Sequence, residues 1–419
     1  MKKSAGPVKS FPLAEQALRT AREVSAERRP DFDDTATTFA HLSDGELRRA
    51  TILFRLMGKP WLTRLMGTVG AAAVRLRLPL ARRLVRATIY RQFVGGRSLK
   101  KARRRIRRLA ELGVDSILDY GAEAGQEEEQ FRRTLRKVLA SIDFAADNES
   151  AIGGVVKLSG TIPLALLERY NAASAAEIFA APELAAGLER VSEVCRRAAA
   201  AGTEVYLDAE ESWIQGTIDR IAETMMARHN TGARPLVFTT CQMYRHDRLV
   251  YLRELIARAA AEGWRPGVKL VRGAYINKEN ARAEAGGYPT PIQPSAAATH
   301  ADYDAAVRFL FARRDELAFC LATHNRASTE LLTGLMDDHL VPRDHPGIRF
   351  SQLLGMSDNL TFNLAAGGFN VSKYMVYGPV TQVLPYLVRR AQENTSVTGE
   401  AGRELALLER ELRRRRQRN

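Results

Sequence analysis

The sequence is poor in cysteine. Its 419 residues include three, Cys195, Cys241 and Cys320, which are widely spaced and odd in number. Such a set provides no disulfide framework and no metal-ligand spacing, so a reducing compartment, the cytoplasm, is expected. The N-terminus begins Met-Lys-Lys but has no apolar segment after it, which argues against a secretory signal.

Long apolar runs are also lacking. Residues 62–74 are mostly apolar but are interrupted by Arg64 and are too few to span a bilayer. No transmembrane helix is therefore expected. The same stretch has an amphipathic face, which would either pack on the main domain or lie on a membrane surface. That face consists of Trp61, Leu62, Leu65, Met66 and Val69.

Acidic residues are scarce in one part of the chain only. The formal net charge is +15, but residues 1–111 carry +17, residues 112–395 carry −5 and residues 396–419 carry +3. Because the body is mildly acidic and has no base-stacking or recognition motif, nucleic acid is not expected as a partner. The charges predict a basic helical N-terminal region, an acidic main domain and a charged C-terminal tail that frays. In place of nucleic acid, the basic N-terminal region could bind anionic lipid and bring the chain to the inner face of the cell membrane.

From residue 112 onward, short apolar runs alternate with helical patterns, as in proteins with a buried parallel sheet. The predicted strands are 116–119, 154–159, 204–208, 236–240, 268–272, 319–323, 348–352 and 371–377. The predicted helices are 127–141, 175–201, 213–229, 247–262, 301–314, 328–339 and 381–393, and 358–366 is less clearly helical. No Gly-x-Gly-x-x-Gly joins a strand to a helix, which disfavours a dinucleotide-binding open sheet. The pattern predicts a distorted (β/α)8 TIM-type barrel over 112–395 with an N-terminal helical extension.

Polar and aromatic residues follow the predicted strands, where a barrel of this kind places its reactive groups. Each alone has an ordinary structural explanation, such as a helix cap or a satisfied buried side chain. Together they predict one pocket that is rich in cations and lacks both metal-ligand spacing and a nucleophile–base pair. Such a pocket suits a phosphorylated cofactor and a small anionic substrate better than hydrolysis. Its lining would be Lys157, Asp208, Gln242, Lys269, Arg272, Tyr275, His324 and Tyr374.

The last predicted barrel helix adds two arginines. Tyr386, Arg389, Arg390 and Glu393 share one helix face at i, i+3, i+4 and i+7. Adjacent guanidiniums beside a tyrosine form a fork for a carboxylate. The same spacing also fits a solvated face with Arg–Glu pairs, and this stretch alone does not decide between the two.

Five motifs, in order, resemble those of the proline dehydrogenase family, in its monofunctional, eukaryotic-like form. They are Leu207-Asp-Ala-Glu-Glu211, Lys269-Leu-Val-Arg-Gly-Ala-Tyr275, Ala322-Thr-His-Asn325, Gln352-Leu-Leu-Gly-Met356, and Tyr374-Met-Val-Tyr-Gly-Pro379 with Tyr386-Leu-Val-Arg-Arg-Ala-Gln-Glu-Asn394. The resemblance implies a distorted barrel that binds FAD, oxidises L-proline to Δ1-pyrroline-5-carboxylate and passes electrons to membrane quinone.

The resemblance also implies roles for individual residues. Arg389, Arg390 and Lys157 would hold the proline carboxylate, and Tyr275, Leu353, Tyr374 and Tyr386 would wall the proline ring. Asp208 would support the tyrosines. Contacts to FAD would come from Asp208, Ala209, Gln242, Lys269, Val271, Arg272, Gly273, Ala274, His324, Asn325, Arg390 and Glu393. Hydride would pass from C5 of proline to the flavin.

Two positions depart from the bifunctional members of the family. Ser295 and Ala296 stand where those members have an Arg/Lys pair, so cofactor contacts in that loop are not carried over. Lys269 stands where they have arginine. The main rival function is that of hydroxyproline dehydrogenase, but Tyr374 would fill the space that a 4-hydroxyl needs. A folate reductase and a basic lipid-binding protein are two further candidate functions.

Overall fold

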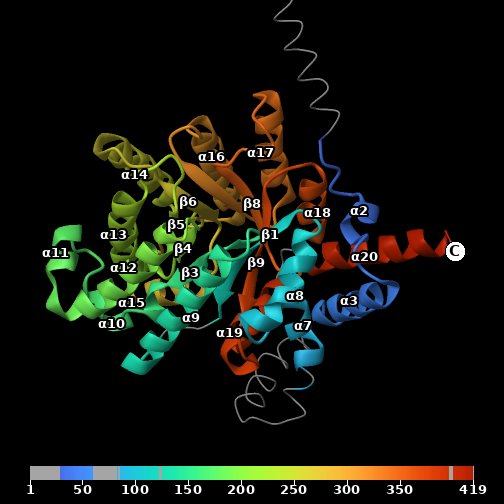
Figure 1. Cartoon of the computed structure of the whole chain (residues 1–419), viewed down its shortest axis with the longest axis horizontal. Helices are drawn as coiled ribbons and strands as arrows, with labels where there is room; N and C mark the ends of the chain where they lie inside the picture. The colour runs from blue at the N-terminus through green and yellow to red at the C-terminus, as the bar shows by residue number, and fades with distance from the viewer. Residues whose placement is uncertain (1–28, 60–82, 84, 122–124, 396–399, 419) are drawn as a thin grey trace, which may run out of the picture.

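Nine parallel strands form one sheet that curls into a barrel with helices around it (Figure 1). The computed structural model describes residues 29–59, 83, 85–121, 125–395 and 400–418. The strands are β1 (Val114–Tyr120), β2 (Ala151–Ile152), β3 (Gly154–Lys157), β4 (Val205–Asp208), β5 (Val237–Gln242), β6 (Gly267–Val271), β7 (Ala318–Ala322), β8 (Ile348–Leu353) and β9 (Val371–Tyr377). All eight predicted strands are present, with ends shifted by at most two residues. The short β2 was not predicted.

The barrel closes at Gly153, between β2 and β3. The sheet order is β2-β1-β9-β8-β7-β6-β5-β4-β3, so β2 pairs with β1 while β3, one residue later, pairs with β4. The two short strands act as one strand that changes partner, which leaves eight strand positions around the barrel. A Cβ on Gly153 would lie 1.6 Å from the carbonyl oxygen of Glu204. Only glycine allows this approach of two backbones.

Helices follow the strands on the outside of the barrel. They are α9 (Glu128–Ala146), α10 (Leu164–Arg169), α11 (Ala175–Ala180), α12 (Ala185–Ala200), α13 (Ser212–His229), α14 (Arg248–Glu262), α15 (Ile276–Gly286), α16 (Ala296–Ala312), α17 (Arg326–Asp338), α18 (Asp358–Ala366) and α19 (Val380–Thr395). The single helix predicted over 175–201 was wrong, because Pro182 interrupts it. Proline disfavours the helical conformation of the residue before it, and Ala181 is extended (φ −76°, ψ 115°).

Before the barrel, the described chain is helical, as predicted. The helices are α2 (Thr35–Phe39), α3 (Asp44–Met57), α7 (Ile89–Phe93) and α8 (Leu99–Ala110). The basic helix α8 buries Ala102, Ile106 and Leu109 and leads directly into β1. Most of the amphipathic stretch predicted near residues 61–74 lies outside the described residues. Among the residues that are described, no helix has both the length and the apolarity to cross a membrane.

The C-terminal helix α20 (Glu400–Arg416) packs on the N-terminal helices instead of fraying (Figure 1). Leu407 and Leu408 are buried in a cluster with Leu47 and Phe54 of α3. The Arg415 side chain donates to the carbonyl groups of Phe39 and Leu42 and to the carboxylate of Asp44. Apolar residues between the charges explain why the tail is a packed helix. The division of the chain at residues 111 and 395 stays a prediction.

The barrel interior is layered. Ile117, Val155, Tyr206, Phe238 and Cys320 fill its middle, and the rings of Tyr206 and Phe238 lie 4.8 Å apart. Below them, at the N-terminal ends of the strands, Glu204 is paired with Arg234 at 2.6 Å and with Arg349 at 3.7 Å. The opposite end of the interior is polar and contains the predicted site.

Candidate active site

Four predicted site residues meet inside the C-terminal end of the barrel. Lys157 and Asp208 end β3 and β4, and Lys269 and Tyr374 lie in β6 and β9. Oδ1 of Asp208 accepts a hydrogen bond from the ammonium of Lys269. Oδ2 lies 3.4 Å from Nζ of Lys157 and accepts from the Tyr374 hydroxyl at 3.1 Å. Asp208 therefore ties four strands together at one point.

A fifth member of this cluster, Asp119 of β1, was not predicted. Its Oδ2 accepts from the Tyr374 hydroxyl at 2.9 Å and lies 3.6 Å from Nζ of Lys157. A signal was present in the sequence, because Asp119 is a carboxylate near the end of a predicted buried strand, where a charge needs a partner. With Lys157, Lys269, Asp119 and Asp208 all ionised, the cluster has no net charge.

Electrostatic interactions within the cluster shift the pKa values of Lys157, Asp208 and Tyr374. Burial alone would lower the pKa of Lys157, but the carboxylates of Asp119 and Asp208 raise it well above its usual value. Burial alone would raise the pKa of Asp208, but the ammoniums of Lys269 and Lys157 hold it below its usual value. Burial and the same two carboxylates raise the pKa of Tyr374. Lys157 and Asp208 are thus charged at neutral pH, and Tyr374 is a neutral donor.

Glu210 and Tyr275 lie beside the cluster. The Glu210 carboxylate accepts two hydrogen bonds from Ser159, one from the backbone N–H at 3.0 Å and one from the side-chain hydroxyl. The Gln242 side-chain amide donates to the Glu210 carbonyl at 2.7 Å. Burial raises the pKa of Glu210 to about 6. Burial, followed by the negative charge of Glu210, raises the pKa of Tyr275, although Lys157 opposes the shift. Tyr275 is therefore a neutral phenol next to the lysine.

The Arg272 side chain, after β6, is held by three neighbours. Its guanidinium donates to Nδ1 of His300 at 2.8 Å, to the Thr323 hydroxyl at 2.5 Å and to the Ser328 hydroxyl at 2.9 Å. It also lies 4.1 Å from the centre of the Tyr303 ring. These contacts orient the guanidinium, and an oriented guanidinium suits an anionic ligand.

The backbone around Gly273 is the second feature of this loop. Gly273 has φ of 132°, and a Cβ there would lie 2.4 Å from the ring of Tyr244. Val271 is half-buried and Ala274 is exposed. The loop therefore combines a conformation that only glycine adopts easily with a backbone that ligands can reach.

His324 follows β7 and contacts the C-terminal helix α20 directly, because Arg403 donates to its backbone carbonyl oxygen at 3.1 Å, and also through Ser357. Its Nδ1 lies 2.9 Å from the Ser357 hydroxyl, and the backbone N–H of Ser357 donates to Glu404 at 2.6 Å. Burial, followed by the positive charge of Arg390, lowers the pKa of His324 well below its usual value. The imidazole is therefore neutral at physiological pH. Glu404 of α20 was not predicted, since it is distant in sequence from every strand end.

Two positions act as helix caps: Asn325, a predicted cofactor contact, and Ser295, where the sequence departs from the bifunctional members. The Asn325 side chain accepts from the backbone N–H of Ser328, at the start of α17, at 3.0 Å. The Ser295 hydroxyl accepts from the backbone N–H of Ala298, at the start of α16, at 3.1 Å. Ala296 is the first residue of α16. A cofactor role for Asn325 stays a prediction beside this capping role.

The two arginines of α19 reach different parts of the site. Arg389 is half-buried, and its positive charge opposes the rise in the pKa of the Tyr275 phenol. Arg390 is buried, and its positive charge lowers the pKa of His324. Its guanidinium carbon lies 5.4 Å from the centre of the Tyr386 ring. The solvated helix face that the spacing also allowed is therefore wrong for Arg390.

The remaining predicted contacts are less informative. Ala209 is buried at the end of β4, and Leu353 is half-buried at the end of β8. The backbone of Glu393 belongs to α19, but its side chain lies outside the described residues. Within the part of the chain that the structure describes, no group of three His, Cys, Asp or Glu side chains could hold a metal ion.

Comparisons with known proteins agree on one family. Residues 102–403 match the family model described as proline dehydrogenase. The chain is 30% identical to proline dehydrogenase 1, mitochondrial, of Arabidopsis thaliana over 79% of this chain and 75% of that protein. It is 38% identical to the human protein of that name, over 54% of this chain and 38% of that protein.

A solved structure supports the fold. The crystal structure of proline utilization A (PutA) from Bdellovibrio bacteriovorus, inactivated by N-propargylglycine, matches with a TM-score of 0.67 at 17% identity. The match covers 93% of this chain but 42% of that chain. The likeness therefore confirms the distorted (β/α)8 barrel, and this chain corresponds to less than half of that protein.

Proposed function

The chain belongs to the proline dehydrogenase family, and from this premise we propose that it oxidises L-proline to Δ1-pyrroline-5-carboxylate with FAD as cofactor. Membership of the family implies a flavin. The observation that carries the proposal is the arrangement of charge at the barrel mouth. At the base of the barrel mouth lies the buried ion-pair cluster around Asp208. The cations Arg389 and Arg390 of α19 lie near Tyr275 and His324.

On the substrate side, Arg389, Arg390 and Lys157 bind the proline carboxylate. Guanidiniums bind carboxylates through paired hydrogen bonds, so they orient the substrate as well as hold it. Tyr275, Leu353, Tyr374 and Tyr386 form the wall around the apolar ring and exclude water from it. The Tyr374 hydroxyl lies within hydrogen-bond distance of Asp119 and Asp208 and can donate to either, which keeps the ring in one orientation.

On the cofactor side, the donor set fits a phosphorylated flavin. Most of its predicted polar side chains are cations or neutral hydrogen-bonding groups: Gln242, Lys269, Arg272, His324, Asn325 and Arg390. The two carboxylates of the set are Asp208, which is paired with Lys269, and Glu393. The accessible backbone at Gly273 allows close approach of a ligand. When bound, FAD would supply a two-electron acceptor for the hydride that leaves C5 of proline, while the nitrogen lone pair forms the C=N bond and the N–H proton is lost. The positive charges of Lys269 and Arg272 would stabilise the negative charge that the flavin gains when it is reduced.

We further propose that membrane quinone is the electron acceptor. The protein would then act in the cytoplasm and bind peripherally to the inner face of the cell membrane. The excess of +17 in residues 1–111 supports this location, because anionic lipids attract basic segments. Co-sedimentation with anionic liposomes that decreases with salt, and that is lost on deleting residues 1–95, is the expected result. Binding that ignores both changes would contradict a role of this region.

The absorbance spectrum of the purified protein tests the main proposal. We expect a flavin band that L-proline bleaches under anaerobic conditions and that a soluble quinone analogue restores. A colourless protein that FAD does not reconstitute, or a band that ignores proline, would overturn it. Faster bleaching by 4-hydroxyproline would favour hydroxyproline dehydrogenase, and bleaching by NAD(P)H would favour a folate reductase.

A further inference from the structure

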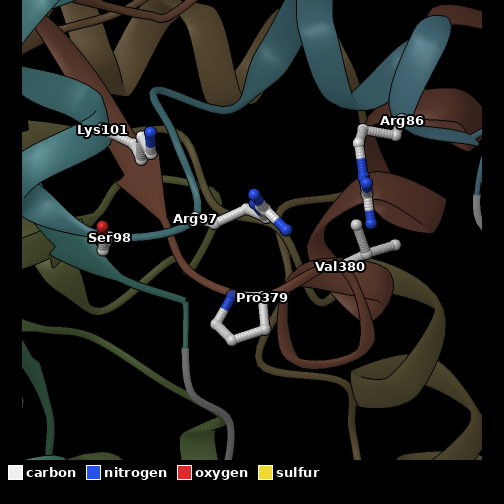
Figure 2. A pocket seen from close by; sticks show the side chains of 6 residues that line it. All are labelled: Arg86, Arg97, Ser98, Lys101, Pro379 and Val380. Atoms are coloured by element: carbon white, nitrogen blue, oxygen red, sulfur yellow. The ribbon is translucent and has the colours of Figure 1, made fainter.

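A surface hollow lies beside the barrel, between the N-terminal helices and the start of α19. Its volume is about 320 Å³, and it is lined by Arg86, Arg97, Ser98, Lys101, Pro379 and Val380 (Figure 2). The two parts of its wall are joined by backbone hydrogen bonds. Gly95 donates to Val376 at 2.8 Å, and Gly378 donates to Gly96 at 2.9 Å. The hollow is therefore framed by ordered backbone on both sides.

Three of the six lining residues are cations. Figure 2 shows the side chains of Arg97 and Arg86 over Pro379 and Val380, with Lys101 beside them. No carboxylate among the described residues forms an ion pair with any of the three. Two other cations of α8 are held by neighbours outside the hollow: Arg108 pairs with Glu46 at 3.2 Å, and Arg105 donates to three backbone carbonyl groups.

The neighbouring phenol does not supply the missing anion. Burial raises the pKa of Tyr90 to about 12, while the charges of Arg97 and Arg86 act in the opposite direction. The Tyr90 hydroxyl donates to the carbonyl oxygen of Gly378 at 2.8 Å, so it is a neutral donor. Both guanidiniums therefore lie near one neutral group, and no carboxylate in the described part of the chain is paired with either of them.

Two helices add to this positive potential. α8 begins at Leu99 and α19 at Val380, so both N-termini open at the hollow. Ser98 precedes α8 but its side chain makes no capping hydrogen bond. Helix N-termini carry partial positive charge and unpaired N–H groups, which favour anions. This contribution supplements that of the three cations.

We propose that this hollow binds a phosphate group, carried either by a small soluble ester or by a lipid headgroup. Guanidinium pairs bind phosphate through parallel hydrogen bonds, and an ammonium adds a point charge. A volume of about 320 Å³ is at the lower end of the range of small-molecule pockets, roughly 300–1,000 Å³, and leaves room for a substituent such as glycerol. The soluble-ester form of the proposal is independent of the proposed function, whereas the lipid form rests on the membrane binding proposed for residues 1–111 and names the site for it.

The test uses the full chain and two probes, sn-glycerol 3-phosphate and vesicles of phosphatidylglycerol with phosphatidylcholine. Binding is measured by titration calorimetry and by co-sedimentation at one ionic strength. The site variant is Arg97→Gln with Lys101→Gln. The matched control is Lys100→Gln with Arg104→Gln, which removes the same charge from exposed positions of α8 outside the hollow.

We expect the site variant to bind at least one probe about tenfold more weakly or worse, and the control to change little, since specific charged hydrogen bonds outweigh diffuse attraction. A loss confined to glycerol phosphate identifies a soluble ester, and a loss confined to vesicles identifies a lipid headgroup. Equal losses in the two double variants, or no saturable binding of either probe, would overturn the proposal. If the double variant does not fold, Arg86→Gln provides the same comparison.

Discussion

The hydroxyl of Tyr374 and Oδ2 of Asp119 are joined by a 2.9 Å hydrogen bond between the adjacent strands β9 and β1. The same hydroxyl lies 3.1 Å from Oδ2 of Asp208. A phenol has one proton, so it can donate to only one carboxylate at a time. The ammonium of Lys157, 3.6 Å from Asp119 and 3.4 Å from Asp208, is shared between them. Asp119 thus fixes two residues that the proposed function places next to the substrate.

Asp119→Asn should destabilise the fold. The change leaves Lys157 and Lys269 with one carboxylate between them, and breaking a buried pair typically costs about 3 kcal/mol. We expect the free energy of unfolding, measured with urea, to fall by about 2–3 kcal/mol. Asp119→Asn combined with Lys157→Met should lose less than the sum of the single changes.

The control for this prediction is Asp115→Asn, which removes the more exposed partner of Arg349 at the other end of β1. Arg349 keeps Glu204 as a second partner, so a loss below about 1 kcal/mol is expected. Equal losses at positions 119 and 115, or strict additivity in the double variant, would show that the cluster is not coupled as described.

Arg389→Met should weaken substrate binding. A charged hydrogen bond contributes about 1.5–3 kcal/mol, and more when its partner is left unpaired, so the KM for proline should rise by more than ~30-fold. Steady-state kinetics with a soluble quinone measure this directly. Arg313→Met, at an exposed pair with Glu316, serves as the control. An unchanged KM in Arg389→Met would remove this residue from carboxylate binding.

The stability of the protein should fall between about pH 4.5 and pH 7 because of Glu404. Burial raises the pKa of this carboxyl to about 7, and the charge of Asp358 acts in the same direction. Because the folded pKa lies above the unfolded one, the stabilisation is complete below about pH 4.5 and is lost as pH rises through about 7. The full effect is about 3 kcal/mol.

Glu404→Gln keeps an acceptor for the Ser357 N–H but cannot ionise. It should therefore unfold at a higher denaturant concentration than the unmodified protein at pH 8.5, and at a similar one at pH 5. Glu409→Gln, on the same helix and paired with Arg55 at the surface, should not show this pH dependence. If Glu404→Gln unfolded at the same denaturant concentration as the unmodified protein at both pH values, the raised pKa of Glu404 would be contradicted.

Gly153→Ala should prevent normal closure of the barrel. The added methyl group would lie 1.6 Å from the Glu204 carbonyl oxygen, which is backbone and cannot rotate away. We expect a loss of at least ~3 kcal/mol or an insoluble protein, since overpacking at a rigid site forces backbone shifts. Gly232→Ala is the control, because nothing lies within 4 Å of its added Cβ. Similar melting temperatures for the two variants would count against this closure.

Much of the site could be predicted because local pattern and chain order fix it. Buried parallel strands are apolar throughout, so all eight were recognisable, and their C-terminal ends meet on one face of a barrel. Lys157, Asp208, Lys269 and Tyr374 were therefore assigned to one pocket without coordinates. The helix over 175–201 was wrong because its apolar period continues across Pro182, where the backbone cannot remain helical.

By itself, the sequence determined the strands, their order, the family and the set of polar residues at the barrel mouth, since these depend on local periodicity and motif. Only the tertiary structure decided which of those residues touch. Asp119 joined the cluster because β9 pairs in register with β1, and Glu404 reached Ser357 because α20 packs back on the barrel. Contacts between distant segments depend on strand register and helix packing, which leave no local period in the chain.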